Sequence, residues 1–120
     1  MLLLWAANPD NPHQCATPFF DAAAALAMDG EVEVYFTGKA VQLLAQGVAE
    51  KMPSGPRQRE TVYAFMQQAA RHGARFYACS HALEEHGLTA ADLIPEASGV
   101  AGAVTYMARC MDDEWTALVY

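Results

Sequence analysis

Two kinds of apolar segment alternate along the chain. Continuous apolar runs, and runs rich in β-branched and aromatic residues, are typical of strands buried in a sheet. Segments in which apolar residues recur every three or four positions are typical of helices. The first kind predicts strands at residues 1–7, 31–37, 75–78, a start at 93–94, and 115–120. The second kind predicts helices at residues 17–28, 60–72 and 99–111, and a short helix that ends at Gly87.

Turn-forming residues separate these segments. Asn8-Pro9-Asp10 ends the first apolar run, and Asp29-Gly30 ends the first helix. The sequence from Thr89 to Asp92 has the form of a helix N-terminal capping box, so we expect one short turn there. Pro95 places the strand that starts at 93–94 near an edge of the sheet, because proline cannot donate a hydrogen bond within a sheet.

The order of the segments predicts the fold class. Strands that alternate with helices of about ten residues form βαβ units, whose strands are parallel. We therefore expect a three-layer α/β/α sandwich around a mostly parallel sheet. At 120 residues the chain has the size of one domain, so we assign residues 1–120 to a single domain.

Charge and hydropathy narrow the class of function. The formal net charge is -7, which disfavours nucleic acid as a partner because the phosphate backbone is also negative. The apolar runs are far shorter than the roughly 20 residues of a membrane-spanning helix, so we expect no membrane partner. Residues 1–7 lack the basic region that opens a secretory signal. We therefore expect a cytoplasmic protein.

The three cysteines do not suggest a disulfide framework or a metal site. Cys15, Cys79 and Cys110 are an odd number, and their spacing matches no structural zinc pattern. Cys79 with His81 and His86 lacks metal-ligand spacing as well. Lys39 follows Thr37-Gly38, but the full phosphate-binding loop is absent. We expect free thiols, with no cofactor and no metal.

Cys79 is the candidate reactive residue. It follows an apolar strand directly and precedes a helix, a position where unpaired backbone N–H groups favour thiolate over thiol. Ser80 and the next backbone amides could stabilise the anion, and His81 or His86 could tune it. Free cysteine is also among the most often buried residues, so a structural Cys79 that only packs is the alternative.

The other two cysteines are weaker candidates for a reactive thiol. Cys15 lies in the loop after the first strand, at the same expected edge of the sheet as Cys79, which makes it a possible second thiol. Cys110 lies late in the last helix beside Met107 and Met111, where it is expected to fill a core or an interface. The stripe of Val100, Val104, Met107 and Met111 on that helix predicts an apolar face.

In the order and spacing of its segments the chain resembles the DsrE/DsrF/TusD-like family of small sulfur-handling proteins. Nearly the whole length takes part in the resemblance. It rests on an apolar first strand with a Pro/Asp loop, an Ala-rich helix at 20–28, VYFTGKAV at 34–41, FYAC at 76–79 leading to HGL at 86–88, and the segment from 99 to 112 before a terminal strand.

The resemblance implies a five-stranded parallel sheet and assembly into trimers or hexamers. In sulfurtransferase members the cysteine after the third strand carries a persulfide from a donor protein to an acceptor, and Cys79 holds that position. Such members often have arginine or lysine where this chain has His86. The family also includes members without demonstrated chemistry. The sequence therefore leaves two alternatives: a sulfur relay through Cys79, or a non-catalytic oligomeric or partner-binding module.

Overall fold

The computed structural model describes residues 2–4, 8–55 and 59–120. Five strands, four α-helices and four 3-10 helices (η) follow one another along this part of the chain. In order they are β1 (Leu2–Leu4), η1 (Pro12–Gln14), α1 (Thr17–Ala27), β2 (Glu33–Phe36), η2 (Gly38–Leu44), η3 (Ala49–Lys51), α2 (Val62–Arg71), β3 (Arg75–Cys79), α3 (Ser80–Glu85), η4 (Ala90–Asp92), β4 (Ala97–Ala101), α4 (Ala103–Cys110) and β5 (Leu118–Val119).

The strands form one sheet in the order β4-β3-β2-β1-β5, and each neighbouring pair is parallel. β2 and β3 are inner strands, with Val34 opposite Phe76 and Phe36 opposite Ala78. β4 and β5 are the two edges. The predicted mixed α/β class with a parallel sheet is confirmed.

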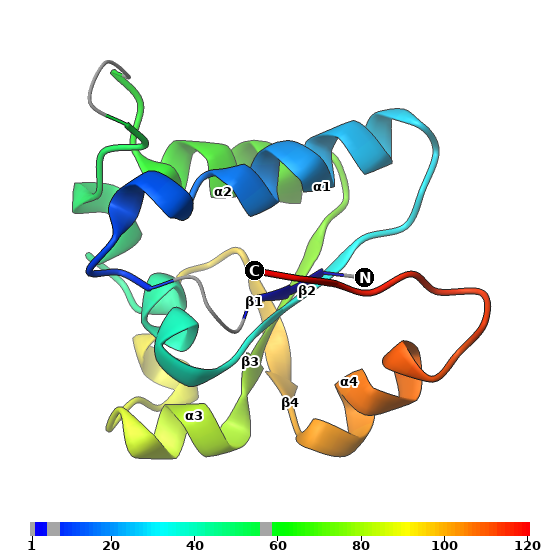
Figure 1. Ribbon diagram of the computed structural model, residues 1–120. Coiled ribbons are helices and arrows are strands. Elements are labelled where there is room, and N and C mark those ends of the chain that lie inside the picture. Colours follow the sequence, from blue (N-terminus) through cyan, green and yellow to red (C-terminus); the bar gives the residue numbers. More distant parts are fainter. Residues whose placement is uncertain (1, 5–7, 56–58) are drawn as a thin grey trace.

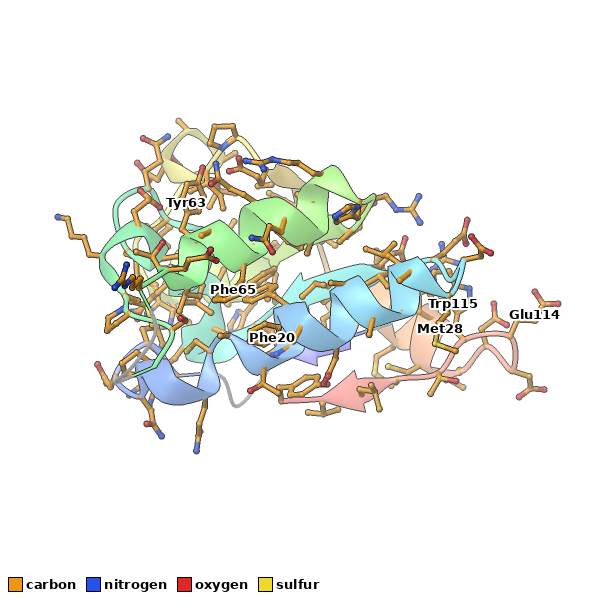
Figure 2. All side chains as sticks on the ribbon, turned by 90° about the horizontal axis from the view of Figure 1, so that it is seen from above. Phe20, Met28, Tyr63, Phe65, Glu114 and Trp115 are labelled. Carbon is orange, nitrogen blue, oxygen red and sulfur yellow. The ribbon has the colours of Figure 1, made fainter. Side chains whose placement is uncertain are left out.

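Side chains of β2 and β3 point alternately to the two faces of the sheet, as in any strand. Val34, Phe36 and Phe76 belong to the main core, where Phe19 of α1 packs on both phenylalanine rings at centroid distances of 6.1 and 5.8 Å. α1 and α2 lie side by side on this side of the sheet (Figure 1). Seen from above, Phe20 of α1 lies beside Phe65 of α2, at 4.4 Å between ring centroids (Figure 2).

The opposite face carries Tyr35 and Tyr77, whose rings stack at 5.3 Å. Tyr106 of α4 packs on Tyr35 at 5.9 Å, and α4 lies on this side of the sheet (Figure 1). No residue of α4 is fully buried. This face is therefore covered less completely than the face under α1 and α2.

Two expected elements lie elsewhere. The fourth strand is not at residues 93–94 but at Ala97–Ala101, and α4 consequently begins at Ala103 instead of residue 99. Leu93 and Ile94 are buried without being part of a strand: Leu93 forms an isolated antiparallel bridge with Ala45, and the Ile94 N–H donates to the Leu44 carbonyl at 2.8 Å. Their apolar character reflects this burial.

The other boundaries agree within a few residues. The capping box of Thr89 and Asp92 is present at η4, as predicted. Val41 and Leu44, which recur at helical spacing in the sequence, lie in the 3-10 helix η2. The first strand was expected over residues 1–7, of which residues 1 and 5–7 lie outside the described part.

Candidate functional site

Parallel strands bring the ends of β2, β3 and β4 to one edge of the sheet. Cys79 is the last residue of β3 and the N-cap of α3, and it pairs in register with Ala101 near the end of β4. η2 follows β2 at this edge and packs against both β3 and α3. In open α/β sheets this carboxyl edge is where ligands bind. Cys79 therefore occupies the expected position.

The Cys79 side chain is mostly covered, with 7% of the residue exposed. It belongs to the main apolar core, and its backbone is extended, with φ -68° and ψ 123°. The first N–H groups of the six-residue helix that follows have no partner within the helix. The thiol thus lies at the boundary between core and solvent, and it accepts no capping hydrogen bond from the helix that follows.

Ser80 is exposed and lies beside the β4–α4 turn. A Cβ built on Gly102 in that turn would come within 4.0 Å of the Ser80 hydroxyl oxygen. The loops that follow β3 and β4 are therefore adjacent, and the Ser80 hydroxyl is the exposed polar group that directly follows Cys79 in the chain.

The two histidines of this segment make contacts with other side chains. His81 Nε2 lies 3.0 Å from Glu85 Oε1, and both side chains are exposed. Gln42 Nε2 lies 3.1 Å from His86 Nδ1. Because an amide nitrogen can only donate, Nδ1 accepts and the proton of a neutral imidazole is on Nε2. The contact joins the end of α3 to η2.

Cys15 has the character of a structural thiol. Its residue is fully buried, and its Sγ donates to the carbonyl oxygens of Asn8 at 3.4 Å and Asn11 at 3.7 Å. Burial raises the pKa of the Cys15 thiol to about 11, so the group is protonated at neutral pH. A protonated, enclosed thiol is a poor nucleophile. Its predicted role as a second thiol gains no support from this geometry.

Cys110 and Lys39 also have ordinary surroundings. Cys110 is partly buried and packs against the small cluster of Tyr35 and Ala101, as expected of a packing residue. Lys39 Nζ lies 3.8 Å from Asp10 Oδ2, and both side chains are well exposed. Such a surface ion pair contributes little to stability.

A buried charge cluster on the α4 side of the sheet was not among the sites predicted from the sequence. Glu33 is 3% exposed; its Oε1 accepts from Tyr35 Oη and Arg109 Nε, each at 2.9 Å, and Arg75 Nη2 lies 3.1 Å from its Oε2. Burial, followed by the contact with Glu33, raises the pKa of Tyr35 to about 12. An acidic residue within an apolar strand was the available signal. Its partners, 42 and 76 residues away, could not be identified from the pattern.

Arg109 connects α4 to this cluster. Its Nη2 also reaches Glu33 Oε2 at 3.4 Å, and its guanidinium lies 4.3 Å from the centroid of the Trp115 ring. Beside the cluster, a groove of about 520 Å³ runs between the sheet and α4 and includes Tyr77, Val100 and Val104 in its lining.

The described residues contain no group of three or more histidine, cysteine, aspartate or glutamate side chains arranged to hold a metal ion. In the same part of the chain, no helix combines the length and apolar character needed to cross a bilayer.

The parallel α/β fold with a cysteine at the carboxyl edge defines only a general class of protein. Comparison with known proteins identifies the family. The model of the DsrE/DsrF-like family matches residues 1–119, and the chain belongs to this family. A search of curated proteins gave no significant match. Among solved structures, a protein of unknown function, MTH1491 from Methanobacterium thermoautotrophicum, is similar with a TM-score of 0.67 and 16% identity, over 99% of this chain and 95% of that one. At this identity the likeness supports the fold alone.

Proposed function

We propose that the protein is a sulfur-relay protein or sulfurtransferase that carries a persulfide on Cys79 between a donor and an acceptor protein. The observation that carries the proposal is the position of Cys79. Cys79 is the last residue of an inner strand, at the carboxyl edge of the sheet, and it keeps a small exposed area. Cys15, in contrast, is fully buried. Membership of the DsrE/DsrF-like family adds support, since sulfur relay is an activity within that family.

The chemistry needs only thiols and persulfides. The Cys79 thiolate attacks the outer sulfur of a donor persulfide; a new S–S bond forms on Cys79, the donor S–S bond breaks, and the donor cysteine leaves as a thiolate. An acceptor thiolate then attacks the same outer sulfur and restores the Cys79 thiolate. Each step consumes one persulfide and forms another, so neither step requires an external oxidant or reductant.

The surroundings define what could stabilise the transferred sulfur. The N–H groups of the first turn of α3 and the exposed Ser80 hydroxyl are donors close to Cys79 in the chain. His86 accepts a hydrogen bond from Gln42, so we expect its effect to be indirect, through the packing of α3 on η2. Hydrogen bonds to a thiolate or persulfide anion favour the charged form.

The proposal also covers the cellular compartment, the partners and the complete fold. A reducing compartment such as the cytoplasm would keep the thiols free. The partners would be donor and acceptor proteins and further copies of this chain. We take the complete fold to be the three-layer sandwich with five parallel strands that is expected of the family.

One observation favours a second candidate function. Cys79 is part of the apolar core and only 7% exposed, which suits a cysteine that packs in a non-catalytic oligomeric or partner-binding module. In that case the thiol would gain no sulfur from a donor while the protein remained folded.

Intact-mass measurement separates the two candidates. The folded protein is incubated with a small-molecule persulfide, freed of excess reagent and weighed beside its Cys79→Ala and Cys110→Ala variants. The relay predicts a gain of one sulfur atom in the wild type and in Cys110→Ala, and its loss in Cys79→Ala. Circular dichroism checks that Cys79→Ala is folded. No gain in the wild type, or a gain that survives Cys79→Ala, would overturn the proposal.

A further inference from the structure

The exposed side of α3 is the protein surface that directly follows Cys79. Two residues of this short helix are buried in the core, and the remaining four are exposed: Ser80, His81, Glu84 and Glu85. We call these four residues the α3 surface. Because α3 begins directly after Cys79, a partner whose cysteine reaches this thiol also faces the α3 surface.

The α3 surface has a negative charge. Glu84 and Glu85 follow Cys79 by five and six residues, which is about 7.5 and 9 Å along a helix axis. His81 Nε2 lies 3.0 Å from Glu85 Oε1, but an imidazole is normally neutral at pH 8, so this pair keeps the charge of the carboxylate. Both carboxylates therefore lie close enough to the thiol for their charge to act on an approaching reagent, since the Debye length is about 10 Å in 0.1 M salt.

Two other segments lie beside α3, and neither offsets this charge. η2 packs against α3, and its basic residue Lys39 forms an ion pair with Asp10 at 3.8 Å. The β4–α4 turn lies next to α3 (Figure 1), and Gly102 and Ala103 in this turn are uncharged. The net charge of -7 for the whole chain has the same sign. A reagent that approaches Cys79 therefore meets a negative field.

We infer that the donor and acceptor proteins approach Cys79 with a basic surface, on which lysine or arginine side chains surround the reacting cysteine. The inference rests on the proposed relay, because it concerns the partners of that chemistry. Complementary charge across an interface speeds association and disfavours wrong partners. A partner cysteine surrounded by carboxylates would be repelled by Glu84 and Glu85, whereas one surrounded by cations would be attracted.

Thiol–disulfide exchange with small reagents of different charge tests the inference in a Cys110→Ala background. The Cys79 thiolate attacks one sulfur of a disulfide, forms a mixed disulfide and releases the other half as a thiolate. The reagents are cystamine, with two ammonium groups, the neutral bis(2-hydroxyethyl) disulfide, and dithiodipropionate, with two carboxylates. Each rate is measured by intact mass at pH 8 and divided by the rate of the same disulfide with free 2-mercaptoethanol. This division removes differences in intrinsic reactivity.

We expect the corrected rate to be higher for cystamine than for dithiodipropionate at low salt. Combining Glu84→Gln with Glu85→Gln should lower the ratio of these two rates about five- to tenfold, because two carboxylates at about 10 Å act on each reagent charge. A changed thiolate fraction of Cys79 cancels in this ratio. In 1 M salt the ratio should approach that of the neutralised variant, since the Debye length is then about 3 Å.

The matched control combines Asp29→Asn with Glu31→Gln. It makes the same charge change at exposed positions before β2 begins, at least six residues, or about 20 Å, along the strands from the level of Cys79. At this distance the rate ratio should fall no more than about twofold.

Peptides extend the test to a surface that resembles a protein partner. Each contains one cysteine, blocked as a mixed disulfide with 2-mercaptoethanol and flanked by lysine, serine or glutamate. The expected order of reaction with Cys79 is lysine, then serine, then glutamate. Equal corrected rates for reagents of opposite charge, or an equal fall in the control variant, would overturn the inference and leave the relay standing, because Cys79 would still react. No reaction of Cys79 with any reagent would overturn the relay, and the inference with it.

Discussion

Replacing Glu33 tests whether the buried charge cluster of Glu33, Arg75 and Arg109 stabilises the packing of α4 on the sheet. In Glu33→Ala the Tyr35 hydroxyl loses its acceptor at 2.9 Å in a residue that is only 2% exposed. Leaving a buried hydroxyl without a partner costs about 1 to 3 kcal/mol. The same change removes the carboxylate from Arg75 and Arg109.

The size of the total effect depends on how exposed the arginines are. Breaking a fully buried ion pair by removal of one partner costs about 3 to 5 kcal/mol. The side chains of Arg75 and Arg109 are 46% and 37% exposed, so water replaces part of what they lose. We therefore expect Glu33→Ala to lower the free energy of unfolding by about 2 to 4 kcal/mol, a fall of roughly 10 °C in melting temperature for a domain of this size.

Urea unfolding followed by circular dichroism, at one protein concentration, measures this change. Glu33→Gln keeps an acceptor for Tyr35 and should cost less than Glu33→Ala. Glu31→Ala is the matched control, because it makes the same charge change at an exposed position two residues before β2 begins at Glu33. Its effect should stay within about 0.5 kcal/mol. If Glu33→Ala is no less stable than Glu31→Ala, the cluster does not stabilise the fold and the reasoning fails.

Two further predictions concern titration and thiol access. The pKa of Cys15 is raised from its ordinary value to about 11 and that of Tyr35 to about 12. The stability that these two protonated groups contribute is therefore complete below about pH 9 and is lost as the pH rises through 11 to 12. The urea midpoint of unfolding should therefore fall across this pH range. In Tyr35→Phe it should fall less steeply. Iodoacetamide should label Cys79 slowly but measurably in the folded protein and Cys15 only after unfolding; equal native rates for the two would contradict their different burial.

The sequence predicted the part of the fold that strong local signals encode. The aromatic and β-branched runs of β2 and β3 located the inner strands, and this placed Cys79 correctly at a strand-to-helix junction. β4 was missed because Ala97–Ala101 contains small residues, with only Val100 having a branched apolar side chain.

The site was predictable in position but not in surroundings. The burial of Cys79, the enclosure of Cys15 and the contact of His86 with Gln42 all depend on segments distant in sequence. His86 is 44 residues from Gln42, and no local pattern encodes that contact. Val104, Met107 and Met111 were visible at helical spacing, but their exposure on α4 was not predictable from that spacing.

Sulfur transfer from Cys79 is the most direct test of the proposed relay. The protein is loaded with persulfide, separated from the donor and mixed with an acceptor thiol, and its cysteine-containing peptides are mapped by mass before and after. The relay predicts one extra sulfur atom on the Cys79 peptide, and its disappearance as the acceptor gains a persulfide. Extra sulfur confined to another cysteine, or sulfur on Cys79 that never passes to the acceptor, would contradict it.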